Sequence, residues 1–383
     1  MRHISLAGFL AAALLAGCSG GGMSSSTPAL SGSATSSVAR TAAASDRDAG
    51  AGAAAAAPAV IHEYQAAGNP DGITRGFDNS FYFAEVGANA LAKITTGGVI
   101  AGTFPVPTPA SAPNTITTGP DGNYWFGEFT GRKVGKLTPS GAITEYSLGA
   151  GDRAANQITV GPDRNLWVTE TGGFVAKVTT AGIVTTYPIP AAPGEVINPN
   201  GIVAGPDGNL WVTGNQNNKV YKISTSGVVL ATYLVPIHGA PDLQNITVGQ
   251  GGVLWFSEGS EGYVAKITTA GVLTEYLVPA GSAPHGIVLA GDCNIYFANT
   301  ANSTIGRITA TGTVTEYPAT PGSGPLTIVN GPNSTLWFTE VNLSKIGVLQ
   351  YSGNACASRS DGGDDGGNDN GDGNKGHRDR GDD

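Results

Sequence analysis

The stretch NGIVAGPDGNLWVTGNQNNKVYKISTSGVVLATYLV, residues 200–235, contains the unit from which most of the chain is built. It divides into four short apolar runs, GIVA, NLWVT, KVYKIST and VVLATYLV, with the clusters GPDGN and TSG among them. Gly supplies positive φ and Pro fixes the first corner of a tight turn, so these clusters are turn sequences. The unit is therefore predicted to be four antiparallel strands.

This unit recurs with a period of about 42 residues, and aromatic residues mark its phase. The second run of each copy carries Tyr82, Trp125, Trp167, Trp211, Trp255, Tyr296 and Trp337, spaced by 43, 42, 44, 44, 41 and 41 residues. Such a period, carried by short strands and Gly-rich turns, is typical of a β-propeller. We predict an all-β fold of seven four-stranded antiparallel blades, with the aromatics packed between blades.

The seventh copy, residues 326–353, lacks the fourth run that reads ITEY at Ile143–Tyr146. One unpartnered run of this kind, IHEY at Ile61–Tyr64, precedes the first copy. The N-terminal strand is therefore expected to complete the last blade, closing a propeller over residues 60–354 and removing an exposed sheet edge. An open solenoid would need capping repeats, and none is visible.

Strand 3 carries a cation in six of the seven copies. These cations are predicted to be ladder charges near the strand-4 glutamates. They are Lys93, Lys136, Lys177, Lys222, Lys266 and Arg307.

The first residues resemble an export signal. Arg2 precedes the apolar run Ile4–Leu15, which is too short to span a bilayer. The run ends in Leu-Ala-Gly-Cys at 15–18, which resembles the bacterial lipobox, so residues 1–17 are expected to be removed and Cys18 to carry lipid. Ser19 next to it implies, by the same resemblance, the outer membrane of a Gram-negative cell. Membrane contact is then expected through the lipid anchor alone.

Residues 18–59, rich in Gly, Ser and Ala, are predicted to be a flexible tether, and residues 355–383, rich in Asp and Gly, a disordered tail. A calcium loop is a less favoured interpretation of the tail, because it lacks the apolar positions of β-roll repeats. Cys293 and Cys356 are the cysteines that remain, and pairing between them is left open. The net charge of −9 argues against a nucleic-acid partner. A monomer is expected.

Two polar rings are predicted to point toward the mouth of the channel at which strand 1 begins, the top face. The strand-1 ring contains Asp71, Asn114, Asn156, Asn200, Gln244, His285 and Leu326. The ring after strand 2 contains Glu85, Glu128, Glu170, Gly214, Glu258, Asn299 and Glu340. Together they predict a polar, acid-lined funnel for a small ligand. The repeated Asn and Glu also have a structural interpretation, as side chains that bond nearby backbone.

The histidines break these patterns. His285 replaces Asn in its ring, and His is the side chain suited to proton transfer near neutral pH. His238, in the loop PIHGAPD at 236–242 with Asp242 close by, is a second candidate for the binding funnel.

The repeats GPDGNLWVTG, GPDRNLWVTE and GPNSTLWFTE, with PHGI at Pro284–Ile287, resemble the virginiamycin B lyases, or streptogramin lyases, over all seven blades. The resemblance implies a propeller that opens type B streptogramin rings by elimination at the ester, with Mg²⁺ in the funnel. It implies catalytic roles for His285 and Glu340. If the site is catalytic, Glu340, Glu258 or Glu85 are the candidate metal-binding or orienting carboxylates. The family's Glu-x-His in the seventh blade is not matched, because Gly324 and Leu326 occupy these places.

The sequence thus predicts an envelope lipoprotein that binds or acts on a small molecule, such as a cyclic ester, in the top funnel. Two alternatives stay open. One is a non-catalytic propeller that binds another envelope protein or a polysaccharide. The other is a lactone-hydrolysing propeller with a metal in its channel.

Overall fold

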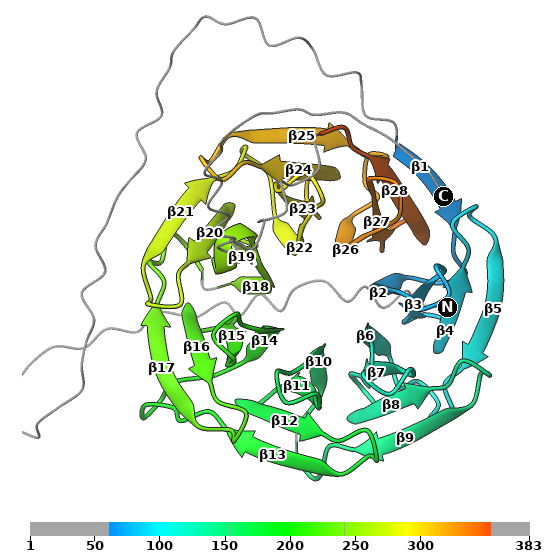
Figure 1. The fold of residues 1–383 in the computed structure, drawn as a ribbon, viewed down its shortest axis with the longest axis horizontal. Coiled ribbons are helices and arrows are strands. Elements are labelled where there is room, and N and C mark those ends of the chain that lie inside the picture. The colour runs from blue at the N-terminus through cyan, green and yellow to red at the C-terminus, as the bar shows by residue number, and fades with distance from the viewer. Residues whose placement is uncertain (1–60, 152, 241, 354–383) are drawn as a thin grey trace, which may run out of the picture. The chain divides into compact units, whose positions relative to one another are not determined.

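The computed structural model describes residues 61–151, 153–240 and 242–353. Seven four-stranded antiparallel sheets stand as blades around a central channel (Figure 1). The predicted all-β, seven-bladed propeller is confirmed. The predicted signal peptide, tether and tail, with Cys18 and Cys356, lie outside the described residues. No helix in the described part of the chain is long and apolar enough to cross a membrane.

Strands follow one another from the channel outward in each of the first six blades. The first three blades contain β2 (Pro70–Arg75), β3 (Phe81–Glu85), β4 (Ala90–Ile94) and β5 (Ile100–Pro105); β6 (Pro113–Thr118), β7 (Tyr124–Glu128), β8 (Lys133–Leu137) and β9 (Ile143–Ser147); and β10 (Ala155–Val160), β11 (Leu166–Glu170), β12 (Phe174–Val178) and β13 (Val184–Pro188). The next three contain β14 (Pro199–Ala204), β15 (Leu210–Gly214), β16 (Lys219–Ile223) and β17 (Val229–Leu234); β18 (Leu243–Val248), β19 (Leu254–Glu258), β20 (Tyr263–Ile267) and β21 (Leu273–Leu277), with the 3₁₀ turn η1 (Gln250–Gly252); and β22 (Pro284–Leu289), β23 (Ile295–Asn299), β24 (Thr304–Ile308) and β25 (Val314–Pro318).

The seventh blade joins the two ends of the described chain. It contains β26 (Pro325–Asn330), β27 (Thr335–Glu340), β28 (Lys345–Gln350) and, as its outermost strand, β1 (Ile61–Gln65). β1 pairs with β28 from Ile61 opposite Leu349 to Gln65 opposite Lys345. Nζ of Lys345 lies 2.5 Å from Oε2 of Glu63 across this pair. The ring is closed by the N-terminal strand, as the missing fourth run predicts.

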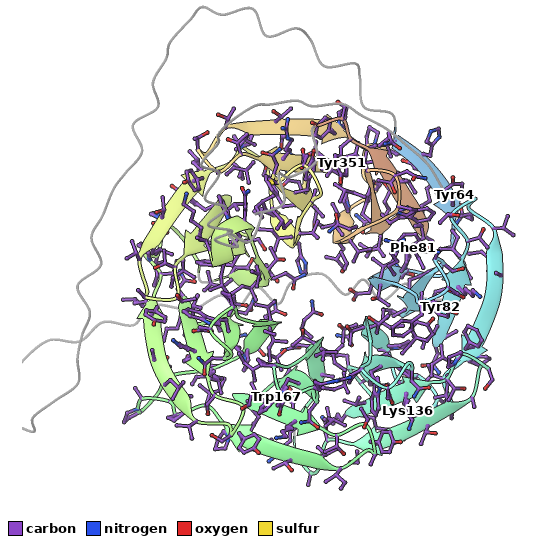
Figure 2. All side chains as sticks on the ribbon, viewed as in Figure 1. Tyr64, Phe81, Tyr82, Lys136, Trp167 and Tyr351 are labelled. Atoms are coloured by element: carbon purple, nitrogen blue, oxygen red, sulfur yellow. The ribbon has the colours of Figure 1, made fainter. Side chains whose placement is uncertain are left out.

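The repeated aromatics form the layers between blades, which confirms their predicted role. Trp125 of the second blade is fully buried in a cluster with Ala155 and Leu166 of the third. Tyr82 and Trp167, labelled in Figure 2, lie in the corresponding clusters of their own blade pairs. Nε1 of Trp167 donates to Oδ1 of Asp163 in the turn before its strand, at 3.0 Å. A buried aromatic ring thus lies in each of these layers, and the turn before strand 2 satisfies the polar edge of Trp125, Trp167 and Trp211.

The strand-3 cations bind at the other end of the blade from the place predicted for them. Nζ of Lys177 lies 3.0 Å from Oδ2 of Asp163, and Nζ of Lys222 lies 2.8 Å from Oδ2 of Asp207. Both aspartates belong to the GPD turns between strands 1 and 2, so the prediction of strand-4 glutamate partners is wrong for these lysines. Each ammonium also lies over the tryptophan ring of its blade.

Glycine in three of the innermost strands lets neighbouring blades approach closely at the channel. A Cβ on Gly72, Gly201 or Gly286 would come within 2.7, 2.6 and 2.4 Å of the backbone of the next innermost strand. These positions therefore require glycine for packing rather than for an unusual φ.

Cys293, in the turn before β23, is disulfide-bonded. The cysteines with which the sequence allows it to pair lie outside the described residues, so the Cys293–Cys356 pairing stays a hypothesis.

Candidate functional site: a polar cup at the channel mouth

The innermost strands begin around a cavity of about 170 Å³ at the top face, which we call the cup. Its lining includes six of the seven strand-1 ring residues predicted from the sequence; Gln244 lies next to it. The lining residues are Asp71, Asn114, Asn156, Gln157, Asn200, Asn245, His285, Leu326 and Thr327. The predicted concave polar site at this mouth is therefore present in the fold.

One arc of the ring joins neighbouring blades. Nδ2 of Asn114 donates to the backbone oxygen of Ala155 at 3.0 Å, and Nδ2 of Asn156 donates to that of Pro199 at 2.6 Å. Nδ2 of Asn200 donates to Oε1 of Gln244 at 2.6 Å. Each bond reaches from one blade to the next, so the repeated amides have the structural role that their repetition indicates.

The other arc consists of His285, Leu326 and Asp71, on the sixth, seventh and first blades. These side chains make no hydrogen bond or ion pair with any other described residue. His285 joins the neighbouring blade through its backbone oxygen, which accepts a 2.5 Å hydrogen bond from Oγ of Ser257. Nδ1 of its side chain is buried without a partner. The open arc therefore contains the polar groups of the cup that do not hold the ring together.

Burial shifts the pKa values of the two titratable side chains of the open arc in opposite directions. Burial raises the pKa of Asp71 to about 7, because the ionised carboxylate loses water. Burial lowers the pKa of His285 to about 4, because the charged imidazolium is disfavoured. At neutral pH His285 is therefore neutral and able to accept a proton, and Asp71 is close to its midpoint.

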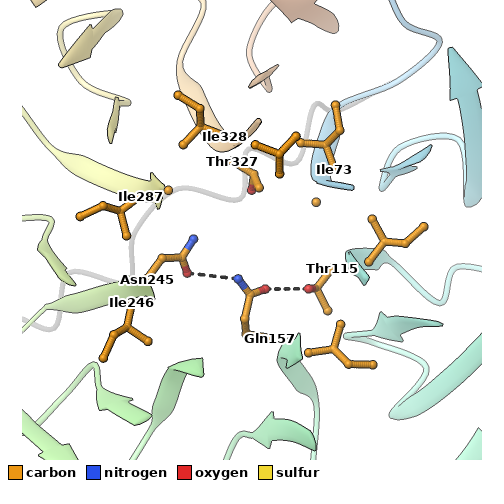
Figure 3. Close-up of a pocket in the computed structure, with 13 residues that line it drawn as sticks. Ile73, Thr115, Gln157, Asn245, Ile246, Ile287, Thr327 and Ile328 are labelled. Carbon is orange, nitrogen blue, oxygen red and sulfur yellow. Dashed lines mark hydrogen bonds between the residues drawn. The ribbon is translucent and has the colours of Figure 1, made fainter. Parts of the chain in front are cut away.

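A hydrogen-bonded bar forms the floor of the cup. Oγ1 of Thr115 donates to Oε1 of Gln157 at 2.6 Å, and Nε2 of Gln157 reaches Oδ1 of Asn245 at 3.4 Å (Figure 3). Beneath it lies a second cavity of about 130 Å³, ringed by isoleucines that include Ile73, Ile246 and Ile328. The polar part of the channel is thus open at the top face and bounded by apolar side chains below.

The floor residues Gln157, Asn245 and Thr327 were missed in the sequence, which singled out one position in each innermost strand. Strict alternation would turn the following residue away from the channel. All seven innermost strands carry a register shift at this point, for example between Pro113 and Thr115. A bulge of this kind re-aims a side chain, so two successive residues can line the channel.

The strand-2 glutamates do not form a second ring of the cup. None of them belongs to its lining, and each is at most 1% exposed: Glu85, Glu128, Glu170, Glu258 and Glu340. The charged neighbours of Glu128 are instead Lys133 and Glu145, on the outer strands β8 and β9 of its blade. Only strand 1 borders the channel, and the side chains of strand 2 face neighbouring blades. The expectation of one acid-lined funnel made by both rings is therefore wrong.

Four of these glutamates are buried with both carboxyl oxygens unpartnered among the described residues. Burial raises the pKa of Glu128 and of Glu340 to about 7, and that of Glu170 to about 8. Burial, with the nearby Glu275 and Glu261, raises the pKa of Glu258 to about 9. At neutral pH Glu170 and Glu258 are therefore mostly protonated, and Glu128 and Glu340 are close to their midpoints. The protonated state is the one in which a carboxyl is least costly to bury.

A magnesium site does not fit this donor set. Across the described ranges, no group of three or more His, Cys, Asp or Glu side chains could hold a metal ion. Glu340 and Glu258, the candidate ligands, lie outside the cup lining and belong to different blades, at the ends of β27 and β19. The cup itself contributes one carboxylate. No step of a reaction is therefore assigned to a metal.

His238 lies outside the cup as well. Its Nε2 is 3.2 Å from Oε1 of Glu275, and its ring stacks on Tyr263 with centroids 4.4 Å apart. Asp242 has other partners, accepting from Nδ2 of Asn215 at 2.7 Å and from the backbone N–H of Ser260 at 2.9 Å. The prediction that His238 belongs to the binding funnel is therefore wrong, and its role is to bind the outer strands of the fifth blade.

The fold and the cup define a class of protein: seven-bladed propellers with a small polar site at the top of the channel. The sequence matches the virginiamycin B lyase family over residues 48–302 and 244–358. The chain therefore belongs to the virginiamycin B lyase family. No curated protein sequence matches it significantly.

Solved structures of this family superpose on the chain. Selenomethionine-substituted virginiamycin B lyase from Staphylococcus aureus is 30% identical, with a TM-score of 0.72, over 77% of this chain and all 100% of that one. A streptogramin B lyase structure is 32% identical, with a TM-score of 0.71, over 76% of this chain and 97% of that one. A catalytically inactive histidine-to-alanine variant of the S. aureus enzyme, with quinupristin, is 30% identical with a TM-score of 0.71, over 77% and 100% of the two chains.

Proposed function

We propose that this propeller binds a cyclic ester of the streptogramin type at the cup, with the ester-bearing edge of the ring against His285. The observation that carries the proposal is the open arc of His285, Leu326 and Asp71, whose side chains are not used to join blades. Its support from relatives is that one solved family member holds quinupristin and is inactive after a single histidine is lost. The cup of about 170 Å³ accepts part of such a ring, and the remainder lies over the mouth.

His285 supplies the proton acceptor that an elimination at an ester requires. In that reaction a base removes the proton on the carbon next to the carbonyl, and the C–O bond on the adjacent carbon breaks to leave an alkene and a carboxylate. Neutral His285, with its pKa at about 4, is a weak base for this step. Leu326 occupies the place at which the family resemblance implies a second histidine, so no imidazole there can assist.

Binding with little or no ring opening is therefore the expected behaviour. Calorimetric titration of the purified propeller with quinupristin measures affinity, and chromatography of the incubated ligand measures ring opening. We expect micromolar binding, with ring opening slow or undetectable. Failure to bind would overturn the proposal.

Substitution of His285 tests where the ligand lies. We expect His285→Asn to weaken quinupristin at least about tenfold, the effect of losing roughly one good polar contact. Asn is compatible with the fold, because the same ring position is Asn in three other blades. His62→Ala, which removes an exposed histidine from β1, is the matched control and should leave affinity unchanged. Equal binding by His285→Asn and the original protein would contradict the placement.

A further inference from the structure

The charges of the cup are unbalanced. Its lining includes a single carboxylate, Asp71, and no lysine or arginine. The other side chains are amides, Thr327, Leu326 and neutral His285. Such a lining repels anions and favours a ligand that is cationic or rich in hydrogen-bond donors.

Asp71 differs from the turn aspartates of the same fold. Asp163 accepts from Nε1 of Trp167 and pairs with Lys177, and Asp207 does the same with Trp211 and Lys222. Asp71 has neither a hydrogen bond nor an ion pair with any described residue. Asp71 is half-buried in the cup, so its carboxylate loses part of its hydration, and a bound cation would compensate for that loss.

A compact organic cation matches the cup better than a metal ion does. Divalent cations take six or more oxygen ligands, usually with several carboxylates, and the cup provides one. A primary ammonium needs one carboxylate and a few neutral acceptors, and the amide oxygens of the lining are such acceptors. Leu326, beside Asp71 in the ring, offers an apolar contact for the carbons next to the nitrogen.

From these observations we propose that the cup selects a ligand with a protonated primary amine on a short apolar chain, with Asp71 as counter-ion. The inference rests on the proposed function, since it uses the same cup and adds a cationic group on the Asp71 side to a ligand whose ester edge lies against His285. It also assigns Asp71 a binding role separate from that of His285.

Two probes of equal shape test the inference, n-butylamine and n-butanol, titrated against the propeller and followed by ligand-detected NMR. At pH 8 we expect the amine to bind at least about tenfold tighter than the alcohol, because only the amine can pair with an ionised Asp71. At pH 6 the amine should bind about tenfold more weakly than at pH 8, since a pKa near 7 leaves roughly a tenth of Asp71 ionised. The alcohol should not respond to pH.

Among the other groups near β2, His285 changes charge near pH 4, outside the tested range. Glu85 and Glu340, at the ends of β3 and β27, lie outside the cup lining. Since the pKa of Glu340 is about 7, the Asp71→Asn variant is needed to assign the response. Burial is the sole cause of the shift on Asp71, and no charged neighbour contributes to it. A dependence on pH between 6 and 8 that disappears in Asp71→Asn is therefore assigned to Asp71.

Asp71→Asn should bind both probes equally, and Asp78→Asn, in the exposed turn of the same blade, should retain the preference for the amine. The first variant is expected to fold, because Asn occupies this ring position in the next two blades. Equal affinity of the two probes in the original protein, no binding of either, or an unchanged preference in Asp71→Asn would overturn the inference. If quinupristin still binds in a manner that depends on His285, the proposed function survives that result; if it does not, both fail.

Discussion

At the scale of single residues, Gly324 and Leu326 determine how far the cup departs from the lyase pattern, and they are constrained differently. Gly324 has a φ of +63°, and a Cβ there would come 2.5 Å from Nδ2 of Asn342. A glutamate at this position would therefore meet both backbone strain and a close contact. Leu326 lies in the cup lining with free space beside it, so it can be exchanged for another side chain.

We predict that Leu326→His folds with a loss of about 1 kcal/mol or less and increases ring opening of a type B streptogramin, because it brings a second imidazole beside the ligand. Gly324→Glu should lower the free energy of unfolding by at least about 2 kcal/mol. Urea unfolding measures the free energy of unfolding of both variants, and chromatography measures ring opening by Leu326→His. Gly322→Ala, with φ +78° and open space around the Cβ, isolates the strain from the contact. A stable Gly324→Glu, or Leu326→His without any gain in ring opening, would contradict this interpretation.

The strand-1 ring could be predicted from the sequence because the repeat fixes its phase, and His285 stands out where Asn is expected. The floor residues could not, since the bulge that turns Gln157 and Asn245 into the channel has no consensus residue. Glu258 and its counterparts are predicted in the funnel because the end of strand 2 lies at the same mouth as the start of strand 1. The repeat gives the position of a strand end but not the direction in which the side chain there points. The burial of these carboxyls between blades is therefore seen only in the structure.

At the scale of elements, a cation near the start of strand 3 pairs with the strand-4 glutamate of some blades and partly offsets the effect of burial on the strand-2 glutamate. In the second blade Lys133 lies 2.9 Å from Oε2 of Glu145 and acts on the pKa of Glu128 in this way. In the seventh blade Lys345 pairs with Glu63 and does the same for Glu340. In the third blade Phe174 replaces the lysine, and Cζ of Arg153, from the preceding loop, lies 4.3 Å from the centre of the Phe174 ring. The positive charge of Arg153 lowers the pKa of Glu170, although burial raises it by more.

The strand that closes the ring depends on one of these cations, so Lys345→Met should destabilise the propeller by about 1–2 kcal/mol. The loss leaves Glu63 and Glu340 without their positive neighbour, while the value stays modest because Lys345 is 28% exposed. Chemical unfolding monitored by tryptophan fluorescence measures it. Lys93→Met, whose partner Asp78 belongs to an exposed turn, is the control and should cost about 0.5 kcal/mol or less. Equal losses in the two variants would show that closure gains nothing from this pair.

At the scale of the whole molecule, the buried carboxyls give the fold a preference for mildly acidic solution. Glu128, Glu340, Glu170 and Glu258 have a pKa of about 7, 7, 8 and 9, against 4.5 when unfolded. Between pH 4.5 and about 9 the folded chain therefore holds more protons than the unfolded chain, so its stability falls as pH rises. His285 acts in the opposite direction between pH 4 and 6.5, but it is one group against these four glutamates and Asp71, whose pKa is also raised.

Strong acid is unfavourable for a separate reason. Glu63, Asp163 and Asp207 have a pKa lowered by hydrogen bonds to lysine and other donors that outweigh their burial. The stability that these ion pairs provide is present above the unfolded pKa of about 4 and is lost as pH falls through the lower folded value. The stability maximum is therefore expected near pH 5 to 6, well below neutrality.

Glu258, with the highest pKa of the set, should control most of the alkaline side of this profile. We predict a Tm at least about 5 °C lower at pH 9 than at pH 5.5, measured by calorimetry. Glu258→Gln should raise the Tm at pH 9 more than at pH 5.5, because the amide has the shape of the protonated carboxyl and never ionises. Glu145→Gln should instead lower the Tm at both values, since the charge of Glu145 is used by Lys133. A Tm that rises from pH 5.5 to 9 would mean that the strand-2 glutamates are ionised in the folded ring, and their burial would then need partners beyond the described residues.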